Sequence, residues 1–157
     1  MTVEQFRELL EPVLRCVTGK ALDRQLEQEL NETFPANGEL FNRVFDACRD
    51  AVAAGWMCSR EAAGIKFGRV IKPAPDTAGF SVDVVEMTDL AGPHHRHPQG
   101  EIDLAMPFTP DGQFDGRGAG WMVYGPDSAH SPTVTGGKVL VLYLLPAGAI
   151  EFSRSNS

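Results

Sequence analysis

Ten residues, Gly92-Pro93-His94-His95-Arg96-His97-Pro98-Gln99-Gly100-Glu101, hold three of the four histidines of this chain together with a carboxylate. On an extended strand, residues two apart point to the same side, so the rings of His95 and His97 should project from one face. Pro98-Gln99-Gly100 predicts a turn, after which Glu101 can fold back beside the two imidazoles. The fourth histidine, His130, follows a Gly-Pro-Asp turn, and a long-range strand pairing could bring it to the same point. Three neutral imidazoles and one carboxylate suit a divalent transition metal and leave coordination positions for water or substrate.

The same residues resemble the motifs of the cupin superfamily, whose members are small jelly-roll barrels. The spacing from His95 to Glu101 matches the core of the first motif, G-x5-H-x-H-x3-4-E-x6-G. The Gly-x5-Pro spacing at residues 120–126 matches the start of the second motif, G-x5-P-x-G-x2-H-x3-N, but Ser128 stands in place of its glycine and His130 comes one residue early. The resemblance implies a single metal site made by His95, His97, Glu101 and His130, with His130 departing most from the pattern.

The ligand types limit which metal ions can bind but do not identify one. Three imidazoles and one glutamate favour Fe(II) or Mn(II), and they would also bind Zn(II), Ni(II) or Co(II).

Length and composition are those of one globular domain. The 157 residues can bury a core without disulfides, and the hydrophobic and charged shares are 43% and 22%. An odd number of cysteines, three, and a charged rather than apolar N-terminus predict a cytoplasmic protein. No apolar run approaches the roughly 18 residues of a membrane span. The net charge of -7 disfavours nucleic acid and anionic membranes as partners, so we expect a small molecule.

The hydrophobic pattern divides the chain near Gly55. Before it, apolar residues recur at three- and four-residue spacing in 2–17, 21–34 and 38–54, which predicts three amphipathic helices. After it, short alternating runs between glycines and prolines predict antiparallel strands. These runs are 66–72, 79–87, 94–97, 101–107, 120–124, 130–135, 138–145 and 149–152, with Gly136-Gly137 as a turn.

The predicted fold is therefore mainly β with N-terminal helices. The resemblance to cupins implies a single-domain cupin, an antiparallel jelly-roll barrel over 56–152, preceded by a helical segment over 1–55 that packs on the barrel. The tail, 153–157, is expected to be disordered.

Two predicted strands need a cover on their outer side. If Glu101 faces a wet metal pocket, then Ile102, Leu104 and Met106 point outward. Residues 139–145 are apolar on both faces, which is unusual for a solvent-facing antiparallel strand. We expect the N-terminal helices and a second subunit to cover these surfaces, which predicts a homodimer.

Further side chains are candidates for chemistry or substrate binding. Tyr124 and Ser128 lie just before His130, where a phenol or hydroxyl could donate to a substrate oxygen or carry a proton. Trp121 could form a wall for an aromatic ring, although most aromatic residues belong to the core.

A substrate carboxylate would call for a basic partner, because a guanidinium fork can bind both oxygens. Arg60, Lys66 and Arg69 lie on or just before the first predicted strands and are candidates for this role. The alternative for each of them is a solvated surface charge.

The whole chain resembles the small bacterial 4-hydroxylaminobenzoate lyase family. The resemblance rests on three helices before one cupin domain and on Gly-Trp-Met-Cys-Ser-Arg at 55–60, Pro-His-His-Arg-His-Pro at 93–98 and Gly-Trp-Met-Val-Tyr-Gly at 120–125. It implies conversion of 4-hydroxylaminobenzoate, a small aromatic carboxylate, to 3,4-dihydroxybenzoate (protocatechuate) with release of ammonia, a step in nitroaromatic breakdown.

Two other functions fit the same residues. Three histidines and a glutamate equally suit a non-heme iron dioxygenase acting on a small aromatic or thiol, which oxygen uptake would distinguish from a lyase. A cupin sensor would bind a small acid without turning it over. The predicted N-terminal helices are mainly acidic and offer no basic helix pair for DNA, which disfavours a DNA-binding regulator.

Overall fold

The computed structural model describes residues 1–153, in which three helices precede a strand-rich barrel. The helices are α1 (Val3–Val17), α2 (Arg24–Thr33) and α3 (Glu39–Ala54), close to the predicted ranges. Their ends follow from local chemistry: Thr2 and Gln5 form a capping box on α1, and the Asp23 side chain accepts the Leu26 N–H at the start of α2. Gly55, with φ 85°, ends α3 in the left-handed conformation that glycine favours.

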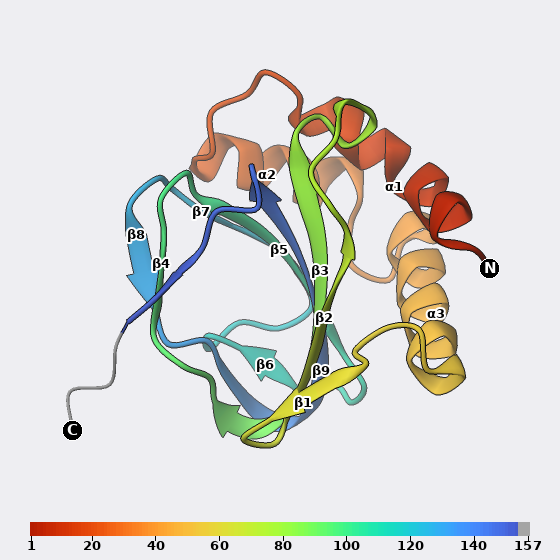
Figure 1. Cartoon of the computed structure of the whole chain (residues 1–157), viewed down its shortest axis with the longest axis vertical. Coiled ribbons are helices and arrows are strands. Elements are labelled where there is room, and N and C mark those ends of the chain that lie inside the picture. Colours follow the sequence, from red (N-terminus) through yellow and green to blue (C-terminus); the bar gives the residue numbers. More distant parts are fainter. Residues whose placement is uncertain (154–157) are drawn as a thin grey trace.

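The strands pair antiparallel throughout the described chain and form two sheets (Figure 1). The larger sheet has the order β1-β2-β3-β9-β5-β7, with β6 paired to β9, and the smaller sheet has the order β10-β4-β8. The strands are β1 (Arg60–Ala62), β2 (Ile65–Ile71), β3 (Phe80–Ala91), β4 (His95–His97), β5 (Glu101–Pro107), β6 (Gln113–Phe114), β7 (Gly120–Tyr124), β8 (Ser128–His130), β9 (Thr133–Pro146) and β10 (Glu151–Phe152). The expected mainly β fold with N-terminal helices is confirmed.

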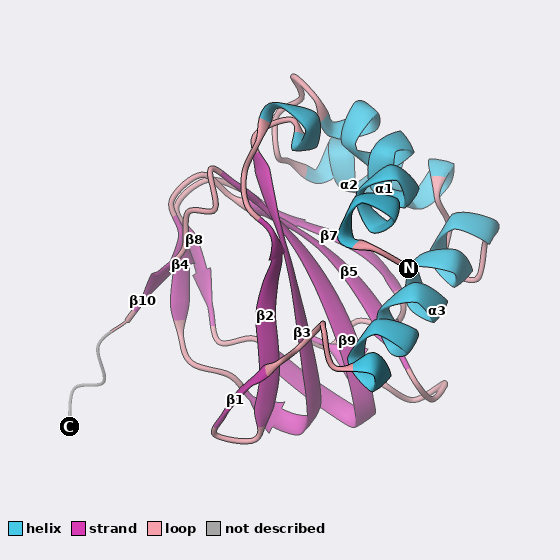
Figure 2. Cartoon of the chain, turned by 45° about the vertical axis from the view of Figure 1, so that its right-hand side comes forward, coloured by secondary structure: helices cyan, strands magenta, loops and turns pink. Residues whose placement is uncertain are grey.

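The helices cover the outer face of the larger sheet, while the smaller sheet lies on its other side (Figure 2). Strand β9 is apolar on both faces because it separates two cores. Leu140, Leu142 and Leu144 pack with the helices, while Val141 and Tyr143 face the barrel interior. Ile102, Leu104 and Met106, all 0% exposed, belong to the helix-side core. The helices of the same chain thus provide the cover that these strands require, and the homodimer stays a prediction.

Helix α2 also protects the edge strand β7, whose free backbone groups could otherwise pair with another chain. The Asn31 side chain accepts the Trp121 N–H at 2.9 Å and donates to the Trp121 carbonyl at 3.0 Å. Glu27 accepts the Val123 N–H at 3.0 Å. These bonds give partners to the free backbone groups of β7 and hold α2 against the barrel.

The turn predicted at Gly136-Gly137 was wrong, because β9 runs through both glycines as one strand. Their φ angles are 73° and 124°, and a Cβ on Gly136 would lie 2.0 Å from the Asp111 carbonyl oxygen. The facing strand β3 is irregular at Asp89, whose carboxylate accepts the Gly137 N–H at 3.0 Å. Strands β3 and β9 therefore bend at this irregularity and remain paired.

At the C-terminus, the Ser153 N–H donates to the His94 carbonyl at 2.9 Å. The rest of the predicted tail, 154–157, lies outside the described residues. Within the described chain, no helix combines the length and the apolar character needed to cross a bilayer.

Candidate metal centre

Strands of both sheets contribute to one cluster of three histidines and a glutamate. His95 and His97 come from β4, two residues apart and on one face, and His130 lies directly opposite His95 across the β4–β8 pair. The turn at Gly100 brings β5 back, so that its first residue, Glu101, faces the imidazoles. A Cβ on Gly100, where φ is 91°, would lie 2.7 Å from the Tyr124 carbonyl oxygen, so this close turn requires glycine.

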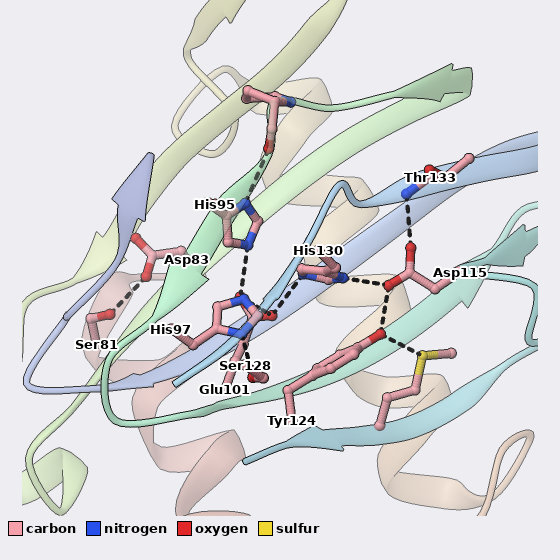
Figure 3. A network of polar contacts seen from close by, with 12 residues as sticks. Ser81, Asp83, His95, His97, Glu101, Asp115, Tyr124, Ser128, His130 and Thr133 are labelled. Carbon is pink, nitrogen blue, oxygen red and sulfur yellow. Dashed lines mark hydrogen bonds and ion pairs between the residues drawn. The ribbon is translucent and has the colours of Figure 1, made fainter. Parts of the chain in front are cut away.

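The four side chains converge on one point inside the barrel (Figure 3). The three imidazole centroids lie 4.7–4.8 Å apart, and one ligand atom from each of the four residues lies within 4.8 Å of the others. This is close to the spacing, about 3 to 4 Å, of ligands that each lie about 2.1 Å from one ion. The side chains of His97 and Glu101 are 0% exposed, and that of His130 is 14% exposed.

Each imidazole is held by the protein through Nδ1 alone. His95 Nδ1 lies 3.3 Å from the Pro93 carbonyl, His97 Nδ1 3.0 Å from Ser128 Oγ, and His130 Nδ1 2.6 Å from Asp115 Oδ2.

The atoms that face the centre of the cluster have no hydrogen-bond partner. They are His95 Nε2, His97 Nε2, His130 Nε2 and both carboxylate oxygens of Glu101, all of them buried. Although His97 Nε2 lies 2.9 Å from Glu101 Oε2, the two are not aligned for a hydrogen bond. Buried polar atoms without partners are rare in proteins. A cation at their centre would satisfy all of them, so the residues present fit a divalent metal.

The partner of each Nδ1 sets which nitrogen carries the proton. The Pro93 carbonyl can only accept, so His95 has its proton on Nδ1. Ser128 has one hydroxyl proton, which it donates to the Gly125 carbonyl at 2.6 Å, so Ser128 accepts from His97 Nδ1. In both rings the lone pair of Nε2 is therefore directed at the centre, as a metal ligand requires.

The histidines differ in electrostatic environment. Burial lowers the pKa of His95 to about 4, which keeps its imidazole neutral. Burial also acts to lower the pKa of His130, but the carboxylates of Asp115 and Glu101 outweigh it and raise this pKa to about 9. A cation bound between these groups would take the place of that proton.

Asp115 is a site residue that the sequence did not indicate. Its Oδ2 accepts from the Tyr124 hydroxyl at 2.6 Å as well as from His130, and its Oδ1 accepts the Thr133 N–H at 2.9 Å (Figure 3). Tyr124 lies with its ring centroid 4.6 Å from that of His130. No sequence pattern marks Asp115, because it follows a strand of only two residues, β6, and meets its partners through long-range pairing.

Asp103 lies two residues after Glu101 on the same face of β5. Its side chain is fully buried, and neither oxygen has a hydrogen-bond donor. Burial and the neighbouring Glu101 carboxylate raise the pKa of Asp103 well above its usual value. Both effects disfavour the charged form of Asp103.

The residues predicted to bind substrate are separated by the structure. Trp121 is buried on the helix side of β7, where its indole donates to the Phe34 carbonyl at 3.0 Å, so it does not face the cluster. Arg60, Lys66 and Arg69 are all exposed. Arg69 shares the interior side of β2 with Phe67, two residues earlier, and donates to Asp83 at 2.8 Å and to the Gly148 carbonyl at 3.2 Å.

Two further polar side chains near the cluster point elsewhere. His94 is exposed, and Arg96 pairs with Asp127 and Glu151 on the outer side of the small sheet.

Cys58 is buried, and burial raises the pKa of its thiol to about 12, which leaves no thiolate for nucleophilic chemistry.

Comparison with known proteins gives a family for the chain. A sequence model described as 4-hydroxylaminobenzoate lyase matches residues 8–152. A 4-hydroxylaminobenzoate lyase from Nocardioides sp. (strain LMS-CY) is 30% identical over 150 residues, covering 90% of this chain and 89% of the relative. One of the same name from Pseudomonas putida is 29% identical over 156 residues, covering 88% and 89%.

Solved structures resemble the chain more distantly. An RmlC-like cupin protein from Ralstonia eutropha has a TM-score of 0.47 at 10% identity, covering 63% of this chain and 66% of that one. A polyketide cyclase from Streptomyces resistomycificus has a TM-score of 0.45 at 17% identity, covering 61% and 75%. From the match over residues 8–152, this chain belongs to the 4-hydroxylaminobenzoate lyase family.

Proposed function

We propose that the chain is a metal-dependent lyase that converts 4-hydroxylaminobenzoate and water to 3,4-dihydroxybenzoate and ammonia. The observation that carries the proposal is the convergence of three unpartnered Nε2 atoms and the Glu101 carboxylate in a member of this family. Fe(II) or Mn(II) suits these ligands best, and Zn(II), Ni(II) or Co(II) would also bind.

The atoms and electrons of the proposed reaction balance without an external oxidant or reductant. One nitrogen leaves as ammonia, one water enters, and the N–O bond that breaks in the hydroxylamine provides the oxidising equivalent for the second ring hydroxyl. No external oxidant is consumed, which distinguishes this reaction from a dioxygenase.

The residues of the cluster have separate roles in this proposal. His95, His97, Glu101 and His130 hold the ion, which when bound supplies a Lewis acid beside the N–O group and lowers the pKa of a neighbouring water. Tyr124, whose hydroxyl donates to Asp115, is the group through which a proton can pass between substrate and that carboxylate. Ser128 orients His97, since its single proton is already donated to Gly125.

We assign the substrate carboxylate to Arg69 and the ring to the apolar residues beside it. Phe67, Val85 and Ile150 pack against the interior core and are only half-buried, so the interior approaches the surface there. Arg69 lies on the same face as Phe67, while Lys66 points to the other side of the sheet. A para-substituted benzoate would then extend from Arg69 at the rim toward the metal cluster.

Ammonia release from 4-hydroxylaminobenzoate by the purified, metal-loaded protein tests the function. We expect ammonia and 3,4-dihydroxybenzoate in equal amounts without oxygen uptake, and loss of both in His95→Ala and Glu101→Gln. Lys66→Met, an exposed change on the other side of the sheet, should keep wild-type activity. Full activity after chelation and removal of the metal would refute metal dependence, and stoichiometric oxygen uptake would refute the lyase assignment.

A further inference from the structure

We propose that Asp115 is a positioning residue that fixes the tautomer of His130 and thereby sets how tightly the site holds its metal. The inference rests on the proposed metal site and concerns a residue that is not itself one of the four ligands. Its basis is the set of contacts around one carboxylate (Figure 3).

Asp115 is anchored independently of His130. Its N–H donates to the Thr133 carbonyl at 2.8 Å, and its Oδ1 accepts the Thr133 N–H at 2.9 Å. The preceding residue, Phe114, pairs with Val134 of β9. Backbone and side chain are thus both joined to the start of β9, and Oδ2 is left to face the site.

Oδ2 can accept hydrogen bonds but cannot donate them. It receives the Tyr124 hydroxyl and His130 Nδ1, both at 2.6 Å. His130 must therefore carry a proton on Nδ1, and in the neutral ring this leaves the Nε2 lone pair directed at Glu101 and the other imidazoles.

His130 is the histidine most in need of such a partner. Its side chain is 14% exposed, against 4% for His95 and 0% for His97. The other two rings are held by uncharged oxygens at 3.3 Å and 3.0 Å, and only His130 has a carboxylate, at 2.6 Å. Hydrogen bonds to a charged acceptor are about twice as strong as neutral ones. The structure thus gives its strongest orienting contact to the least enclosed ligand.

Asp115→Asn tests the tautomer with almost no change in shape. If the amide oxygen keeps the Thr133 N–H, the NH₂ group faces His130 Nδ1, which must then become an acceptor. The ring proton moves to Nε2 and blocks the metal. If the amide is flipped, its NH₂ group opposes the Thr133 N–H instead, and two donors face each other.

The measurement is the affinity of the intact metal-free protein for Mn(II) alone, from titration of free Mn(II) by electron paramagnetic resonance. We expect Asp115→Asn to weaken binding about 10- to 100-fold, the usual effect of removing an orienting partner. Asp115→Glu restores a carboxylate and should recover part of the loss. Tyr124→Phe removes the other donor to Oδ2 and should leave Mn(II) affinity unchanged.

The outcomes separate positioning from a purely structural role. If Asp115→Asn lowers the melting temperature of the metal-free protein but binds Mn(II) as tightly as wild type, Asp115 only ties the loop to β9 and the inference is wrong. The same holds if Asp115→Glu is no better than Asp115→Asn. If the wild-type protein binds none of Mn(II), Fe(II), Zn(II), Ni(II) and Co(II), the proposed metal site itself fails.

Discussion

At the scale of single residues, the proposed contact of Arg69 with the substrate carboxylate depends on how Asp83 holds the guanidinium. The two residues are directly opposite on β2 and β3, and Ser81 donates to the second Asp83 oxygen at 2.7 Å. Arg69 donates to Asp83 through Nε and to the Gly148 carbonyl through Nη2. A guanidinium has five N–H donors, so donors remain for a substrate carboxylate.

Arg69→Met keeps the apolar stem of the side chain and removes its charge. We expect KM for 4-hydroxylaminobenzoate to rise about 10- to 100-fold, from the roughly 1.5–3 kcal/mol of a hydrogen bond to a charged group, with kcat nearly unchanged. Phenylhydroxylamine, which lacks the carboxylate, should be turned over equally by wild type and variant. The matched control is Lys66→Met, which should change neither substrate's kinetics. Equal losses with both substrates would place the role of Arg69 in the fold rather than in carboxylate binding.

At the scale of elements, regular periodicity could be predicted and irregular contacts could not. The helices follow from 3.6-residue periodicity with Thr2, Asp23 and Gly55 at their ends. Strands β1 and β6 were missed because three and two residues show no alternation. Gly136-Gly137 suggested a turn because no local signal distinguishes a turn from an irregularity within a long strand.

The same reasoning separates what was predictable at the site. His95, His97 and Glu101 lie in one local spacing, which a sequence displays directly. The orienting partners of His97 and His130 do not, because Ser128 is 31 positions from His97 and Asp115 is 15 positions from His130. Which side of β7 Trp121 would occupy likewise depended on where the helices pack.

The turn between β4 and β5 shows how an element positions a ligand. A Cβ at Gly100 would lie 2.7 Å from the Tyr124 carbonyl oxygen and 2.8 Å from a Leu22 methyl carbon, at a φ of 91°. We expect Gly100→Ala to lower the free energy of unfolding by more than about 1 kcal/mol and to weaken Mn(II) binding, because Glu101 must shift with the turn. Chemical denaturation and Mn(II) titration measure the two effects.

Gly19 provides the matched control for that change. Its φ is 71°, but no heavy atom lies within 4 Å of an added Cβ. Gly19→Ala should therefore cost only the left-handed strain, about 1 kcal/mol, and leave Mn(II) affinity intact. Equal effects of the two substitutions on metal binding would mean that the Gly100 turn does not position Glu101.

At the scale of the whole molecule, the larger sheet joins two cores, one beneath the helices and one inside the barrel. Strands β5 and β9 contribute to both, so the helices support the sheet from which Glu101 projects. This arrangement removes the sequence-based reason for a second subunit over Ile102, Leu104 and Met106. The predicted homodimer would need another surface for its interface. Size-exclusion chromatography with light scattering of the purified protein measures the oligomeric state.

Because the helices and the barrel share the outer core, we expect them to unfold together. Leu104 is 0% exposed between the sheet and the helices, so Leu104→Ala should cost about 2–5 kcal/mol, and Val3→Ala, at a residue 44% exposed, less than about 0.5 kcal/mol. Trp121 lies in this interface and Trp56 packs against the same core, so tryptophan fluorescence reports on it, while far-ultraviolet circular dichroism follows the helices. Both signals should give the same midpoint in wild type and in Leu104→Ala, since one shared core makes one cooperative unit. Helices that melt first, with the barrel and its Mn(II) affinity left intact, would show that the N-terminal segment only rests on the barrel and does not support the site.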